Sequence, residues 1–197
     1  MIFQKNFNFE NCIGKHTLLY GETETKKTYY TAKFIQFLIN VKNFNSKQIS
    51  ILDFAPPKEL INNVKIGGKI IDFFENSINC NNICFKGNII PPRLKARNTN
   101  ELYENACKNY KKTYKILEKF NDSPTETLII NDVSIYLHIG NKKLLIDSIR
   151  KSNTFFGNAY YGSSIKSDFN TQFSLREKRL VEYLIKKMDY SYSTRSK

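Results

Sequence analysis

The segment from His16 to Asn40 constrains the fold most strongly, because it indicates a strand, a polar loop and a helix in direct succession. His16 to Tyr20 is a short apolar run that stops at Gly21, as a buried strand stops at a turn. From Lys27 to Asn40, aromatic and aliphatic residues recur at steps of three and four and therefore share one helix face. This succession is typical of α/β domains.

The rest of the chain continues the alternation of strands and helices. Compact apolar runs predict strands at 48–54, 127–133 and 154–160. Helical spacing predicts helices at 99–120 and 142–150, and a final helix that begins at the capping box Ser174 to Glu177. Residues 58–92 give mainly loop signals, with short candidate elements at 69–74 and 83–85. We predict an α/β fold in three layers, with a mostly parallel central sheet and helices on both faces.

Length and composition fit one packed domain. The chain has 197 residues, of which 41% are hydrophobic, so it is long enough to bury a substantial core. We expect one domain over residues 1–189. Residues 190–197 are small, polar and basic, and we expect them to form a frayed, flexible tail.

Charge and hydropathy limit the partners. The formal net charge of +13 favours nucleotides or nucleic acid, although an excess of lysine also keeps a surface solvated. No apolar run approaches the length of about 20 residues that spans a bilayer. The first residues lack the basic and apolar regions of an export signal. We therefore expect a cytoplasmic protein without membrane contact.

The cysteines and histidines give only a weak indication of a functional site. Cys80 and Cys84 have three residues between them and, with Cys12, His16 or His138, offer the ligand types of a zinc site. Ordinary free thiols are the competing interpretation. His16 and His138 are solitary and favour structural roles.

The loop after the first strand resembles a phosphate-binding loop, with glycine, four residues, glycine, lysine and serine or threonine. The residues concerned are Gly21, Glu22, Thr23, Glu24, Thr25, Lys26, Lys27 and Thr28. Backbone N–H groups of such a loop hold phosphate oxygens, the lysine neutralises charge, and the hydroxyl of Thr28 binds Mg²⁺. Lys26 replaces the second glycine, and the two glutamates add negative charge that opposes an anion unless they point away. A plain strand-to-helix turn is the alternative interpretation.

An acidic residue at the tip of a neighbouring strand completes such a site. Leu128-Ile-Ile-Asn-Asp132 supplies it, and we predict that Asp132 holds Mg²⁺ with Thr28. Lys27 and Asp132 are the predicted catalytic residues, and ATP with Mg²⁺ is the predicted ligand. An aspartate that only caps the strand is the competing interpretation.

The order of these motifs resembles the RecA-like and KaiC-like ATPases among the P-loop NTPases. The stretch Thr17 to Gly21 is similar to their first strand, Ile130 to Tyr136 to their acidic strand, and Phe155 to Tyr160 to the strand that follows. The resemblance implies that Asn158 senses the terminal phosphate. These enzymes usually carry a glutamate shortly after the second strand, where this sequence has Asp53-Phe-Ala-Pro-Pro57 and then Glu59. The departure implies slow ATP hydrolysis or nucleotide-dependent regulation without turnover.

Two further functions remain open. Arg93, Lys95 and Arg97 alternate as on one side of an extended segment, where they would clamp phosphate or contact a nucleic-acid backbone. A solvated turn without a ligand is the competing interpretation. With Arg93 and Arg97 near an acceptor, the protein would be a group transferase, such as a small kinase or a corrinoid adenosyltransferase. With a degenerate nucleotide site, it would be a basic nucleic-acid-binding module. The resemblance also implies possible homo-oligomers.

Overall fold

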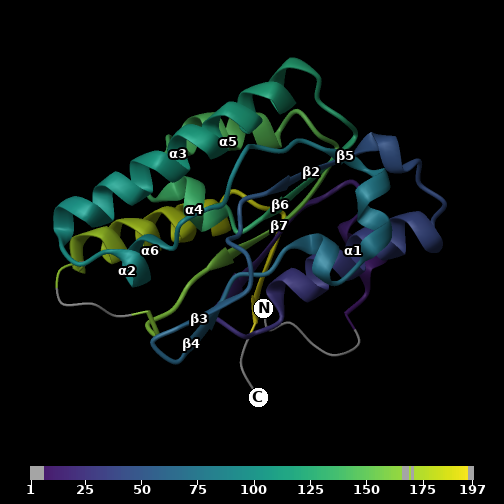
Figure 1. The fold of residues 1–197 in the computed structure, drawn as a ribbon. Coiled ribbons are helices and arrows are strands. Elements are labelled where there is room, and N and C mark those ends of the chain that lie inside the picture. Colours follow the sequence, from purple (N-terminus) through teal and green to yellow (C-terminus); the bar gives the residue numbers. More distant parts are fainter. Residues whose placement is uncertain (1–6, 166–168, 170, 195–197) are drawn as a thin grey trace.

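A six-stranded sheet organises the molecule (Figure 1), and the computed structural model describes residues 7–165, 169 and 171–194. The strand order is β5-β2-β6-β7-β1-β8, and neighbouring strands are parallel throughout. The strands are β1 (His16–Gly21), β2 (Ile49–Asp53), β5 (Asn81–Asn82), β6 (Thr127–Asn131), β7 (Thr154–Tyr160) and β8 (Tyr190–Thr194). Because β1, β6 and β7 are parallel neighbours, their carboxyl ends meet at one edge of the sheet.

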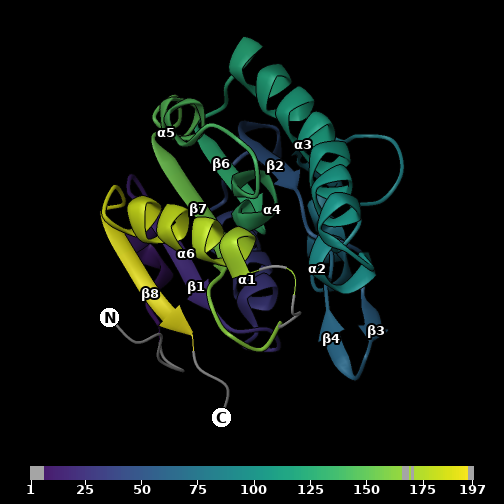
Figure 2. The same cartoon turned by 90° about the vertical axis from the view of Figure 1, so that its left-hand side faces the viewer.

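The helices connect and cover these strands. They are α1 (Lys27–Asn40), α2 (Pro92–Lys95), α3 (Thr99–Asp122), α4 (Val133–Leu137), α5 (Lys142–Ile149) and α6 (Thr171–Ile185). Short 3-10 helices occur at Phe9–Cys12, Ser46–Gln48, Ile70–Asp72 and Glu75–Asn79. A separate antiparallel hairpin, β3 (Glu59–Ile61) and β4 (Val64–Ile66), projects beside the carboxyl edge of the sheet (Figure 2). It turns at two asparagines with φ of 49° and 61°, the left-handed values that a tight two-residue turn requires.

Each face of the sheet has its own apolar core, because successive side chains of a strand point to opposite sides. Leu18 and Phe155 belong to a cluster with residues of α3 to α6. Leu19 and Phe156 belong to a second cluster with residues of α1. The ring of Phe34 in α1 stacks on that of Phe156, with centroids 4.4 Å apart. The structure therefore confirms the predicted three-layer α/β fold.

The predicted tail was wrong for residues 190–194. Tyr190–Thr194 form β8, which pairs in parallel with β1 from Thr17 to Gly21. The alternation of tyrosine and serine suits a strand, and β1 supplies the backbone partners that sequence alone does not reveal. Residues 195–197 lie outside the described residues.

Three local predictions also need correction. The final helix begins at Thr171, so Ser174 and Glu177 lie inside it and form no capping box. Residues 92–95 form the short helix α2 rather than an extended segment. Of the short candidates, only Ile70–Asp72 is regular, as a 3-10 helix. None of the helices in the described part of the chain combines the length and apolar character needed to cross a bilayer.

Candidate functional site

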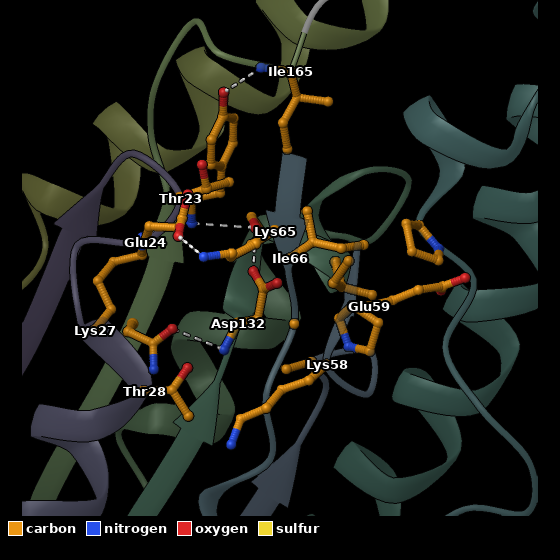
Figure 3. A pocket seen from close by; sticks show the side chains of 18 of the residues that line it. Thr23, Glu24, Lys27, Thr28, Lys58, Glu59, Lys65, Ile66, Asp132 and Ile165 are labelled. Carbon is orange, nitrogen blue, oxygen red and sulfur yellow. Dashed lines mark hydrogen bonds and ion pairs between the residues drawn. The ribbon is translucent and has the colours of Figure 1, made fainter. Parts of the chain in front are cut away.

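A cavity of about 1050 Å³ lies at the carboxyl edge of the sheet (Figure 3). One wall is the loop after β1 with the first turn of α1, and the opposite wall is the hairpin β3–β4 with the start of α2. Asp132, Asn158 and Tyr160, at the ends of β6 and β7, line it as well. This is where open parallel sheets usually bind ligands.

The loop backbone provides donors for an anion. Glu24 and Lys26 have φ of 58° and 62°, so left-handed residues alternate with their neighbours. Such alternation turns successive N–H groups toward one concave side. Among the described residues, the backbone N–H groups of residues 23–26 find no protein acceptor. Together with the start of α1, they form a set of backbone donors at the cavity wall, and their binding of a polyphosphate stays a prediction.

Lys26 adopts the backbone conformation that glycine would provide. Its φ of 62° and ψ of 20° lie in the left-handed region, which costs a residue with a Cβ about 1–2 kcal/mol. The chain therefore makes the same turn as the motif without the second glycine, at the expense of local strain.

Replacing Lys26 with glycine is expected to raise the free energy of unfolding by about 0.5–1 kcal/mol, because relief of the strain exceeds the entropy that glycine gains in the unfolded chain. Urea denaturation measures the change. Lys26→Ala removes the same charge but keeps the Cβ, so it should give no gain. An equal gain in both variants would point to charge rather than backbone strain.

The side chain of Lys27 folds back onto the loop and bonds to its backbone. Its ammonium donates to the carbonyl oxygen of Gly21 at 3.0 Å, to that of Glu22, and to the hydroxyl of Thr25 at 3.3 Å. Burial lowers the pKa of Lys27 to about 8, although the charges of Asp132 and Glu22 favour the protonated form. Lys27 is thus a half-buried cation bonded to the backbone of the loop that the sequence assigns to phosphate binding.

Asn131 is the residue that sequence reasoning missed. Its Oδ1 accepts hydrogen bonds from the hydroxyl of Thr28 at 3.1 Å and from Asn158 at 2.8 Å. Its Nδ2 donates to Asp53 at 2.8 Å. Asn131 is the last residue of β6 and points toward the first turn of α1. Its position at the end of a strand could have indicated Asn131, but a neutral amide next to an aspartate is a weaker candidate for a site residue than the aspartate itself.

Asp132 takes the next position and faces the cavity. It has a left-handed φ of 60°, and its backbone N–H donates to Oδ1 of Asn158 at 3.2 Å. Its carboxylate accepts from Ser134. Burial raises the pKa of Asp132, and Glu177 raises it further, whereas the hydrogen bond from Ser134 and the charge of Lys27 act in the opposite direction. Its predicted metal role and that of Thr28 stay predictions.

Asn158 is placed between the loop helix and the strand of Asp132. It is buried, and its Nδ2 donates to Thr31 of α1 at 2.9 Å and to Asn131. It also lines the cavity. Its amide therefore links α1, β6 and β7 beside the loop, and its role as a phosphate sensor remains a prediction.

Both loop glutamates are held by other segments. Glu22 accepts from the backbone N–H groups of Ser163 at 2.5 Å and Ser164 at 3.3 Å, and from both hydroxyls. Burial raises the pKa of Glu22, but these hydrogen bonds outweigh it and leave the pKa below its ordinary value. Glu24 lies 3.7 Å from the ammonium of Lys65 in β4. Their charges are thus partly compensated.

The basic residues Arg93, Lys95 and Arg97 are each paired with a glutamate and are not free to bind a phosphate together. Arg93 is buried and makes two hydrogen bonds to Glu177, at 2.6 and 3.1 Å. Lys95 pairs with Glu59, and Arg97 pairs with Glu101 at 3.3 Å. The predicted shared side of an extended segment was wrong, because α2 turns these side chains toward different acids.

His138 has a structural setting. It is buried, and its Nε2 lies 2.9 Å from Oε1 of Glu177. His16 contacts the carbonyl oxygen of Ser152. Cys80 is buried whereas Cys84 is exposed, and within residues 7–165, 169 and 171–194 no three His, Cys, Asp or Glu side chains gather as a metal site requires.

The C-terminal strand supports the loop. Thr194 of β8 lies with its hydroxyl 2.6 Å from that of Thr25, and it also donates to the carbonyl oxygen of Tyr20 at 3.2 Å. A Cβ on Gly21 would lie 2.4 Å from the carbonyl oxygen of Thr194. Gly21 is therefore required for close packing against β8.

Comparison with known proteins supports the fold. The sequence matches no family model and no curated protein. The crystal structure of the flagellar accessory protein FlaH from Methanocaldococcus jannaschii has a TM-score of 0.51, with 11% identity over 98% of this chain and 78% of that one. The Pyrococcus furiosus Hef helicase domain has a TM-score of 0.41, with 10% identity over 94% of this chain and 36% of that one. The likeness to FlaH agrees with the predicted three-layer α/β fold with a parallel sheet, and it concerns the fold alone.

Proposed function

We propose that the protein binds ATP with Mg²⁺ at the loop of residues 21–28. The observation that carries this proposal is the set of backbone N–H groups at residues 23–26 that find no acceptor among the described residues, beside the half-buried ammonium of Lys27. Both lie at the start of a 14-residue helix, whose N-terminus favours anions. A plain strand-to-helix turn does not require a lysine whose ammonium bonds back to the carbonyl oxygens of the turn.

Each residue of the loop has a role in this proposal. The backbone from Gly21 to Lys27 holds the phosphates, and the Lys27 ammonium compensates their charge. Thr28 and Asp132 hold Mg²⁺, which takes few protein oxygens and neutralises phosphate charge when bound. Asn131 orients the hydroxyl of Thr28, and Asn158 senses the terminal phosphate.

The geometry favours slow hydrolysis or nucleotide-dependent regulation. Glu59, the nearest glutamate after the second strand, lies in β3 and pairs with Lys95. Asp53, at the end of β2, accepts from Ala55, Ile70 and Asn131. Both carboxylates are engaged with protein groups, and a base for the attacking water needs hydrogen-bond reach of that water.

Lys27→Ala tests the proposal. We expect its affinity for ATP with Mg²⁺ to be at least tenfold lower than that of the wild type, because the cation inside the loop is lost. Isothermal titration calorimetry measures both affinities. Lys47→Ala, an exposed lysine distant in sequence from the loop, should bind as the wild type does. Equal affinity in the wild type and Lys27→Ala would reject the assignment.

Group transfer is the second candidate, favoured by the size of the cavity. At about 1050 Å³ it extends from the loop to the apolar side chains of Leu60, Ile66 and Phe73, which leaves room for an acceptor molecule. The acceptor role predicted for Arg93 and Arg97 has no support, because both pair with glutamates. Product analysis with ATP and candidate acceptors distinguishes transfer from hydrolysis. Nucleic-acid binding and homo-oligomers stay predictions, and salt-dependent binding tests the former.

A further inference from the structure

We propose that Lys65 contacts the terminal phosphate of a bound nucleoside triphosphate and so makes the site prefer a triphosphate to a diphosphate. This inference rests on the proposed function. Lys65 lies on β4, across the cavity from the phosphate loop, and projects toward Glu24 (Figure 3). No sequence motif points to it, because the hairpin lies more than 30 residues after the loop.

The partner of Lys65 marks where an anion would lie. Its ammonium is 3.7 Å from Oε1 of Glu24, at the centre of the loop. The backbone N–H of the same Glu24 is one of the donors of residues 23–26 that find no acceptor in the part of the chain that the structure describes. An anion held by that N–H group would therefore bind at the residue whose carboxylate Lys65 now contacts. The cation is already directed at the phosphate position.

The hairpin holds Lys65 in this place. Lys65 pairs across the hairpin with Leu60, and both line the cavity. The base of the hairpin is fixed by Gly67, where a Cβ would lie 2.2 Å from the carbonyl oxygen of Pro57. The tight turn fixes the other end. The hairpin therefore places the backbone of Lys65 beside the cavity.

The present contact is easily exchanged. The side chains of Lys65 and Glu24 are 72% and 56% exposed, and ion pairs so exposed contribute little to stability. A terminal phosphate carries more charge than one carboxylate and offers several acceptor oxygens. Lys58, by contrast, lines the same cavity but lies 4.4 Å above the ring of Phe73 and 3.5 Å from Asp72. Lys65 is the hairpin lysine whose partner belongs to the phosphate loop.

The test compares a triphosphate with a diphosphate. Calorimetry measures the affinity of the wild type, Lys65→Met, Lys65→Arg and Lys58→Met for the β,γ-imido analogue of ATP and for ADP, each with Mg²⁺. We expect Lys65→Met to bind the triphosphate analogue about tenfold more weakly and ADP within twofold of the wild type. Lys65→Arg keeps the cation and should bind both as the wild type does. Lys58→Met matches the charge change in the same cavity and should also be unchanged.

The outcomes separate this inference from the proposed function. If the wild type binds neither nucleotide, the proposed function fails and this inference falls with it. If the wild type binds both, an unchanged Lys65→Met overturns the inference alone. Equal losses for triphosphate and diphosphate, or an equal loss in Lys58→Met, also overturn it, because they indicate a general electrostatic effect.

Discussion

Replacing Glu177 with alanine is expected to lower the free energy of unfolding by about 3–5 kcal/mol. Glu177 is buried in α6 and accepts hydrogen bonds from Arg93 at 2.6 and 3.1 Å, and its Oε1 lies 2.9 Å from Nε2 of His138. Burial raises its pKa, but Arg93 and His138 outweigh this and keep the pKa below its ordinary value. Without the carboxylate, Arg93 remains as an uncompensated buried charge.

Urea denaturation of Glu177→Ala, with Glu104→Ala as the control, measures this effect. Glu104 is exposed on α3, and its removal should change stability by less than about 0.5 kcal/mol. The double variant Arg93→Met with Glu177→Leu removes both charges and should recover much of the loss. A loss below 1 kcal/mol in Glu177→Ala would mean that Arg93 readily finds water or another partner.

The same network explains why one sequence prediction went wrong. Arg93 was expected to be a free cation, because three basic residues alternate in a short stretch. Its partner Glu177 is 84 residues away in the chain, and α6 brings it beside α2 only in the folded molecule. Stacking of the Arg93 guanidinium on Tyr160, at 4.9 Å from the ring centre, completes its burial. Long-range pairing of this kind leaves no local pattern.

Local sequence patterns, in contrast, correctly predicted those parts of the site that lie within one continuous segment of the chain. Strand, loop and helix between His16 and Asn40 follow from the neighbouring residues themselves. The apolar run 127–133 likewise predicted β6, although the strand ends at Asn131 and Val133 begins α4. The contact of Thr28 with Asn131 was out of reach, because it depends on which of two adjacent residues at the strand end points toward α1. A shift of one residue reverses the side to which a strand side chain points.

The C-terminal strand leads to the second large effect. Gly21→Ala is expected to lower the free energy of unfolding by about 3 kcal/mol or more and to detach β8 from β1. An alanine Cβ would lie 2.4 Å from the carbonyl oxygen and 2.6 Å from the hydroxyl of Thr194. Backbone atoms cannot yield as a flexible side chain does, and the positive φ of 154° adds strain for any residue with a Cβ. Thr194 would lose its contact with Thr25, which loosens the loop of residues 21–28.

Gly14→Ala is the matched control. Gly14 also has a positive φ, 69°, but a Cβ there meets only the side chain of Asn153, at 3.9 Å. The free energy of unfolding of Gly14→Ala should therefore fall by only about 1 kcal/mol, the cost of a left-handed backbone for a residue with a Cβ. Urea denaturation gives the two stabilities, and hydrogen exchange at residues 190–194 reports whether β8 detaches. The clash with Thr194 is the difference between the two sites. Two results would therefore show that β8 does not constrain the loop: an equal loss of stability in both variants, or amides of residues 190–194 that stay protected from exchange in Gly21→Ala.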